Sequence, residues 1–94
     1  MSDLQVVDRP ASLRYEATLE DELVGVIEYR LDGDTIAMLH TEVEPHHEGE
    51  GIGSELVRRA LDDVRANGKK LQPLCPFVRS FLDRHDEYRD LVAN

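Results

Sequence analysis

The stretch Glu48-Gly49-Glu50-Gly51-Ile52-Gly53 places three glycines at alternate positions, directly before a run with helical periodicity. Glycine has no Cβ, so the backbone of such a loop can approach a ligand closely. The helix that follows would offer free N–H groups and the positive end of its dipole, which together favour phosphate. From the glycines alone, a phosphate site and a loop that only turns tightly into a helix are about equally supported.

Two well-known phosphate loops do not match this stretch. A Walker loop needs Lys and then Ser or Thr after its last glycine, whereas Gly53 is followed by Ser54 and Glu55. A dinucleotide fingerprint needs the spacing G-x-G-x-x-G after an opening strand, with an acidic residue at the end of the next strand. The spacing here is G-x-G-x-G, and three predicted strands precede it. Both kinds of site are therefore excluded.

The segment after the glycines is typical of an amphipathic helix that begins at about Gly51. Its apolar residues recur at helical spacing and form one stripe, which comprises Ile52, Leu56, Val57, Ala60, Leu61 and Val64. Asn67-Gly68 predicts the end of the helix, because Gly68 can take the left-handed conformation just beyond the last turn.

Three strands are predicted before the glycines, over Ser12–Leu19, Leu23–Leu31 and Thr35–Val43. The first alternates apolar and polar residues, as a half-buried strand requires, and the second is rich in β-branched residues. Asp32-Gly33 predicts a type I′ hairpin turn between the second and third strands, because glycine readily supplies the positive φ. The strands therefore form an antiparallel meander. Residues 1–11 are expected to be a flexible N-terminal segment.

A short strand and a helix are predicted after the long helix. Leu71–Leu74 is expected to return beside the third strand, and Pro76 to be the first residue of a helix, where its missing N–H costs nothing. Phe77, Phe81 and Leu82 would be the buried face of that helix, and residues 86–94 allow a last short one. The long helix connects the third and fourth strands as a βαβ crossover, so these two strands should be parallel. The sequence predicts one α/β (α+β) domain with a mixed sheet over residues 1–94.

Charge and cysteine content narrow the function classes. The chain has 94 residues and a formal charge of −9, and residues 1–47 carry eleven acidic side chains against three arginines. Such a surface disfavours nucleic acid and anionic membranes and favours cationic partners, although acidity by itself often only maintains solubility. A single cysteine cannot form an internal disulfide. Without an apolar run typical of a signal peptide or a membrane span, a cytoplasmic location is expected.

The glycine stretch resembles the acetyl-CoA signature Q/R-x-x-G-x-G/A of the GNAT N-acetyltransferases, with Glu48 in place of Gln or Arg. The strings His40–Val43, Glu48–Gly53, Pro73–Val78 and Arg84–Tyr88 are similar, in this order, to the minimal single-domain GNAT-like predicted acetyltransferases. The resemblance implies a GNAT-like fold with splayed parallel strands and acetyl-CoA as acetyl donor. It places the pyrophosphate on the amides of Gly49, Glu50, Gly51, Ile52, Gly53 and Ser54, and the pantetheine beside the backbone of Thr41 and Val43.

The glutamate at position 48 is a departure from that signature, and a carboxylate near a pyrophosphate is unfavourable. The backbone cradle does not depend on this side chain. Basic residues of the nearly neutral second half are candidates for the outer phosphates, and these are Arg58, Arg59, Lys69, Lys70, Arg79 and Arg84.

Acetyl transfer to an amine requires a proton acceptor and a proton for the leaving thiolate. Strict alternation would place Ile36, Met38, His40 and Glu42 on one face of the third strand, so His40 and Glu42 are candidates for the proton acceptor. Each alone is more simply a residue satisfied within the sheet or at its rim.

Cys75 precedes Pro76 and is expected at the N-cap of the next helix, where the dipole lowers the pKa of a thiol. It would lie opposite His40, and could carry the acetyl group covalently or protonate the departing thiolate; direct attack by the amine is equally open. A lone cysteine is more often a small apolar core residue. Tyr88 fits packing better than acid catalysis, and His46-His47 has poor geometry for a metal, so no metal is expected.

These features predict an acetyl-CoA-dependent N-acetyltransferase. Its acceptor would be a primary amine, favoured to be cationic, such as a protein lysine or a polyamine. The alternative is a non-catalytic acyl-CoA-binding or protein-interaction module on the same fold, because little chain remains to hold an acceptor.

Overall fold

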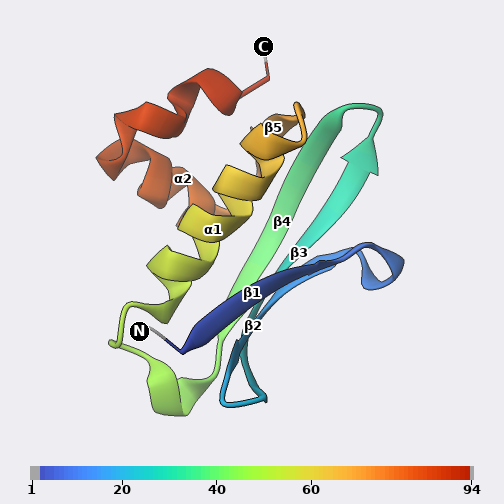
Figure 1. Ribbon diagram of the computed structural model, residues 1–94. Helices are drawn as coiled ribbons and strands as arrows, with labels where there is room; N and C mark the ends of the chain where they lie inside the picture. Colours follow the sequence, from blue (N-terminus) through green and yellow to red (C-terminus); the bar gives the residue numbers. More distant parts are fainter. Residues whose placement is uncertain (1–2, 94) are drawn as a thin grey trace.

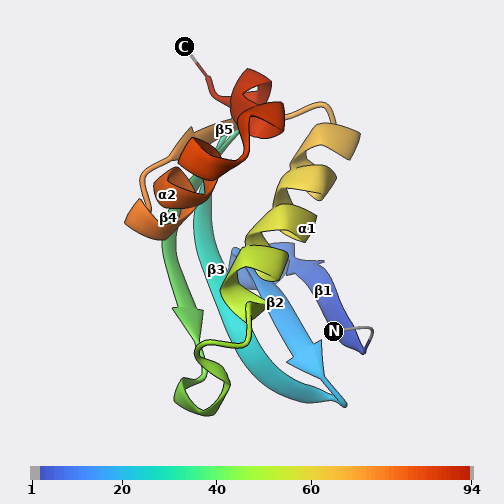
Figure 2. The same ribbon diagram turned by 90° about the vertical axis from the view of Figure 1, so that its left-hand side faces the viewer.

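Five strands form one sheet in chain order, and the helices pack on one of its faces (Figures 1 and 2). The computed structural model describes residues 3–93. Its strands are β1 (Leu4–Arg9), β2 (Arg14–Leu19), β3 (Glu22–Asp32), β4 (Thr35–Val43) and β5 (Lys70–Pro73). Its helices are α1 (Ile52–Ala66) and α2 (Pro76–Arg84), with short 3-10 helices η1 (Pro10–Ser12), η2 (Pro45–His47) and η3 (Asp86–Leu91).

The strand pairings confirm the predicted mixed sheet. Strands β1 to β4 pair in antiparallel fashion, and β5 pairs with β4 in parallel after the crossover through α1. Only Thr35–Met38 of β4 pair with β5, because β5 is four residues long. Beyond Met38, β4 therefore continues without a strand on its β5 side, because β5 ends at Pro73; the splay of the two parallel strands stays a prediction.

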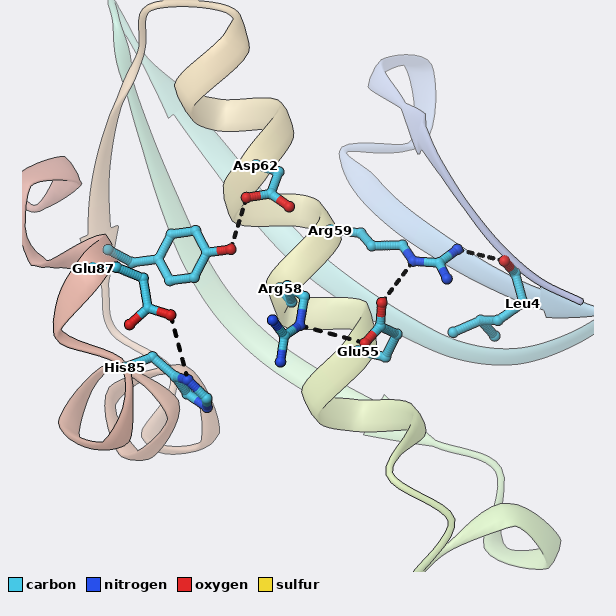
Figure 3. A network of polar contacts seen from close by, with 8 residues as sticks. Leu4, Glu55, Arg58, Arg59, Asp62, His85 and Glu87 are labelled. Atoms are coloured by element: carbon cyan, nitrogen blue, oxygen red, sulfur yellow. Dashed lines mark hydrogen bonds and ion pairs between the residues drawn. The ribbon is translucent and has the colours of Figure 1, made fainter. Parts of the chain in front are cut away.

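The prediction of a flexible segment over residues 1–11 is wrong for Leu4–Arg9, which form β1 and pair with β2 along their whole length. Leu4 is buried, and the Tyr29 hydroxyl donates a hydrogen bond of 2.6 Å to Asp8. Figure 3 shows a further tie, in which the Arg59 guanidinium on α1 donates to the backbone carbonyl of Leu4. These contacts hold β1 at the edge of the sheet, and residues 1–2 lie outside the described part of the chain.

Both hairpin turns contain two residues, and their types follow from backbone φ. Glu20 and Asp21, between β2 and β3, have φ values of 50° and 68°, as in a type I′ turn. Between β3 and β4 the turn residues are Gly33 and Asp34, and only Gly33 has positive φ, as in a type II′ turn. The predicted hairpin is confirmed, but its turn is shifted by one residue and is of the other type.

The core lies between the sheet and the helices. All six apolar residues of the predicted α1 stripe are buried, and they meet Tyr15, Ile27 and Met38 from the sheet. Burial raises the pKa of Tyr15, and its hydroxyl donates a hydrogen bond of 2.8 Å to Asp63 on α1, which adds to that rise. The helix ends as predicted, with Gly68 at a φ of 67°.

The buried face of α2 consists of Val78, Phe81 and Leu82, whereas Phe77 is 39% exposed. The prediction that Phe77 belongs to this face is therefore wrong, because the first turn of α2 extends beyond the sheet core and over the glycine loop. The expected last short helix is the 3-10 helix η3. Within residues 3–93, no helix is both long and apolar enough to cross a lipid bilayer.

Candidate functional site

A cleft of about 370 Å³ lies between the glycine loop and the end of β4. It is lined by Thr41, Val43, His47, Glu48, Gly49, Gly51, Ile52, Gly53, Ser54 and Phe77. Seven of the eight residues predicted to hold the cofactor are in this set, and Glu50 is the exception. The structure therefore folds the glycine loop back, through η2, against the end of β4 that β5 does not pair with.

The glycine loop has a backbone that other residues adopt only with strain. Gly49 and Gly51 have φ values of 86° and 81°, and Gly51 is the N-cap of α1. The amides of the first helical turn have no acceptor within the helix, and those of Ile52, Gly53 and Ser54 belong to residues that line the cleft. An anion in the cleft would thus meet free N–H groups and the positive end of the α1 dipole.

Gly53 and Phe77 fit against each other at the mouth of the cleft. A Cβ on Gly53 would lie 2.6 Å from Cζ of the Phe77 ring. The ring therefore occupies the space that the glycine leaves free, and it joins the first turn of α2 to the first turn of α1. Sequence reasoning missed this role of Phe77, although a third glycine inside a helix, where alanine is favoured, was a signal of close packing.

His47 connects the glycine loop to the start of β3, and sequence reasoning missed this too. Its Nδ1 lies 2.8 Å from Oε1 of Glu50, and its Nε2 lies 3.9 Å from Oε1 of Glu22. The hydrogen bond to Glu50 raises the pKa of His47; partial burial opposes this shift, and the charges of Glu50, Glu22 and Glu44 add to it. Glu50 therefore turns toward His47, and its negative charge is partly compensated beside the cleft.

Cys75 lies between β5 and α2, as predicted, and is the N-cap of α2. It is 3% exposed, and its thiol donates a hydrogen bond of 3.4 Å to Oγ1 of Thr41. The N–H groups of Leu74 and Cys75 both donate to the carbonyl oxygen of Met38, at 3.1 and 2.9 Å, which fixes the sulfur beside β4.

The surroundings of Cys75 favour the thiolate. Burial raises the pKa of the thiol, but the Thr41 hydroxyl and the nearby N–H groups of Val78 and Phe77 outweigh burial, so the pKa lies below the ordinary value. The neutral thiol makes no capping hydrogen bond to α2. The interaction with these amides therefore matters mainly for the charged form.

His40 and Glu42 do not lie where strict alternation predicted. Glu28 pairs with His40 and Tyr29 with Met38, so Leu39 is an extra residue, a β-bulge in β4. Beyond the bulge the alternation changes phase, and Thr41 rather than His40 reaches Cys75. His40 and Glu42 instead have side chains 56% and 73% exposed, with His40 Nε2 at 3.7 Å from Glu42 Oε2. The prediction that they share a face with Met38, opposite Cys75, is wrong.

Three other residues considered from the sequence, Arg58, Arg59 and Tyr88, are engaged in structural contacts (Figure 3). Arg58 and Arg59 both pair with Glu55, at 3.4 and 2.9 Å, so neither is a free cation for a phosphate. The Tyr88 hydroxyl donates a hydrogen bond of 2.7 Å to Asp62; burial, followed by this bond, raises the pKa of Tyr88 to about 12. Within residues 3–93, no group of three His, Cys, Asp or Glu side chains could hold a metal ion.

Comparison with protein families gives a match over residues 14–91 to the family described as GCN5-related N-acetyl-transferase. The chain belongs to this family. The match runs from β2 to η3, so it includes β4, the glycine loop, β5 and Cys75. No protein with a curated function matches the chain.

Several solved structures of acetyltransferases have the same fold as this chain. A GCN5-like candidate N-acetyltransferase from Staphylococcus aureus, solved by NMR, has a TM-score of 0.72 and 26% identity, over 100% of this chain and 92% of that one. The ribosomal-protein-S18-alanine N-acetyltransferase from Escherichia coli has a TM-score of 0.58 and 18% identity. That match covers 63% of this chain and only 39% of the longer enzyme, and at this identity it supports the fold alone.

Proposed function

We propose that this protein transfers the acetyl group of acetyl-CoA to a primary amine, and that the acceptor is cationic. The observation that carries the proposal is one continuous cleft, which extends from the glycine loop to Thr41, the hydrogen-bond partner of Cys75. A glycine loop whose amides suit a phosphate at one end, and a thiol with a lowered pKa beside the other, would match the two ends of a CoA thioester.

The protein backbone around the cleft offers groups that suit a ligand of the CoA type. Gly49 has no heavy atom within 4 Å of the place where a Cβ would be, so the loop is open on that side. The amides of residues 49–54 would hold the pyrophosphate, and the unpaired edge of β4 at Thr41 and Val43 would hold the pantetheine. When bound, acetyl-CoA supplies an activated acyl group. The exposed Glu48 carboxylate is a cost, and the charge of His47 offsets part of it.

Cys75 can act in two ways on this account. As a nucleophile, the thiolate bonds to the acyl carbon, the bond from that carbon to the sulfur of CoA breaks, and the departing thiolate takes a proton. In a second step the amine takes the acetyl group and Cys75 regains its thiolate. As an acid, the thiol of Cys75 instead gives its proton to the departing thiolate while the amine attacks directly.

His40 and Glu42 would serve on the opposite face of the sheet. An amine that enters from this face, beside the part of β4 that β5 does not pair with, would pass His40, which could accept the proton that an ammonium must lose before it attacks. Glu42 lies close enough to stabilise the resulting imidazolium. Because the bulge turns His40 and Glu42 away from Cys75, the thiol and the proton acceptor would act from opposite faces of β4.

The test combines ligand binding, turnover and mass spectrometry. Acetyl-CoA should raise the melting temperature, and a panel of lysine peptides, polyamines and neutral amines should release CoA with the cationic acceptors first. Brief incubation with acetyl-CoA alone should add an acetyl group to Cys75 if the thiolate is the nucleophile. A Cys75→Ala variant with full activity would exclude both roles of the thiol, and Ser80→Ala, an exposed change on α2, is the matched control.

A non-catalytic acyl-CoA-binding module is the second candidate. It is favoured by the face of the sheet away from α1, which no helix of the described chain covers (Figure 2). A rise in melting temperature with acetyl-CoA, but no CoA release with any amine, would select this candidate; no rise at all would exclude both.

A further inference from the structure

A second hollow, of about 170 Å³, lies where the ends of β3 and β4 meet η2. We call it the acidic pocket. Leu23, Val26 and Pro45 provide its apolar wall, and Glu42 and Glu44 are the two acidic residues of its lining. Val43 lines both this pocket and the cleft, so the two hollows adjoin at a single residue of β4.

The two carboxylates of the acidic pocket are poorly compensated. Glu44 is half-buried, and in residues 3–93 its side chain makes neither a hydrogen bond nor an ion pair. Glu42 is exposed, and its ion-pair partner is His40 at 3.7 Å, which is positive only when protonated. His47 feels the charge of Glu44 but is bonded to Glu50. A half-buried carboxylate without a partner is more stable when a cation approaches it.

The size and lining of the acidic pocket select one kind of occupant. Pockets that enclose whole small molecules have volumes of about 300–1,000 Å³, and this one is smaller. It matches one long side chain, with an aliphatic stem against Leu23, Val26 and Pro45 and a cationic head at the carboxylates. The first 47 residues contain eleven acidic side chains and three arginines, so a basic partner would be attracted from a distance as well.

We propose that the acidic pocket docks a lysine side chain of a basic polypeptide beside the acetyl-transfer cleft. This inference rests on the proposed function and specifies its acceptor: a protein lysine rather than a free polyamine. A polypeptide presents its lysines singly on a surface, which suits a small open hollow. A polyamine would leave its further charged nitrogens without partners there.

The test is a binding measurement without acetyl-CoA, so that it does not depend on turnover. The probe is a short fluorescent peptide of alternating lysine and glycine, and fluorescence anisotropy gives its Kd. The same peptide with every lysine acetylated is the uncharged control. We expect binding of the charged peptide only, and affinity that falls with added salt.

A matched pair of variants locates the site. Glu42→Gln with Glu44→Gln should weaken peptide binding about 3- to 30-fold, the range that loss of two partly exposed ion pairs allows. Asp32→Asn with Asp34→Asn removes the same charge at the opposite end of the same two strands and should change the Kd less than about twofold. Leu23→Ser should weaken binding without a change in charge.

An equal loss of peptide affinity in both double variants would overturn the proposal, because it would mean that the net charge of the protein alone attracts the peptide. Spermine that binds while the lysine peptide does not would overturn it as well. The melting-temperature assay with acetyl-CoA is run on the same samples. If acetyl-CoA binds but the lysine peptide does not, only the docking site is contradicted. If the peptide binds but acetyl-CoA does not, the proposed function is contradicted.

Discussion

The two faces of β4 differ sharply, although they belong to the same nine residues. On the face toward α1, Met38 is buried, Thr41 contacts Cys75 and Val43 lines the cleft. On the other face, which no helix of residues 3–93 covers (Figure 2), His40 and Glu42 have largely exposed side chains. One extra residue, Leu39, separates the two patterns. The comparison indicates that a single bulge can place the partner of the Cys75 thiol on one face of a strand and the His40–Glu42 pair on the other.

The largest expected contrast is in stability, between two adjacent residues of β3. Ile27 is fully buried toward α1, so Ile27→Ala should lower the free energy of unfolding by about 2–5 kcal/mol. Glu28 is exposed on the other face, so Glu28→Ala should change it by less than about 0.5 kcal/mol. Urea unfolding measures both, and similar losses would mean that the second face is also covered.

The next contrast concerns two glycines with positive φ at opposite ends of the domain. Gly51→Val and Gly33→Val each force a β-branched residue into a strained backbone, at a cost of about 1–3 kcal/mol. Only Gly51→Val should also abolish the rise in melting temperature with acetyl-CoA, because only Gly51 belongs to the cleft. An acetyl-CoA effect that survives in Gly51→Val at full size would remove the glycine loop from the binding site.

A smaller effect is expected at the Thr41–Cys75 contact. Thr41→Val removes the hydroxyl that helps to keep the pKa of Cys75 low, so burial should dominate and the pKa should rise. The pH midpoint of Cys75 modification by a small alkylating reagent, followed by mass spectrometry, should therefore move upward. Thr35→Val, at the other end of β4, is the control. An unchanged midpoint in Thr41→Val would show that the amides at the start of α2 alone keep the pKa of Cys75 low.

The smallest effect is expected at His47. Its pKa is raised in the folded protein, so the ion pair with Glu50 stabilises the fold fully below about pH 6.5, the value for a free histidine. This contribution is lost as the pH rises through the raised pKa. The difference in melting temperature between the wild type and His47→Gln should be largest at acidic pH and decline toward alkaline pH. A difference in melting temperature that grows with pH would contradict a stabilising ion pair between His47 and Glu50.

Periodicity was sufficient for most of the fold. The α1 stripe, the crossover to a parallel β5 and the proline-started α2 all follow from local patterns, and Gly68 ends α1 as its residue type predicts. Strand β1 was missed because Asp8 interrupts its apolar alternation, and that carboxylate is satisfied by Tyr29, a residue of a distant strand. Such a partner is visible only in three dimensions.

The part of the candidate site that consists of backbone groups was predictable from the sequence. The part that depends on the register between paired strands was less so. The glycine loop was found from residue type alone. The positions of His40 and Glu42 were not, because the bulge at Leu39 arises from the pairing of β4 with β3 and leaves no local mark. The contacts of Phe77 and His47 join separate elements, so only the packed structure reveals them.

The most direct test of the account is the change in backbone amide NMR signals when acetyl-CoA is added to the ¹⁵N-labelled protein. We expect the largest shifts at residues 49–54, at Thr41 and Val43, and around Cys75 at the start of α2. Residues of the outer face such as Glu28 should shift little. Absence of shifts, or shifts centred on the outer face with the glycine loop unchanged, would contradict it.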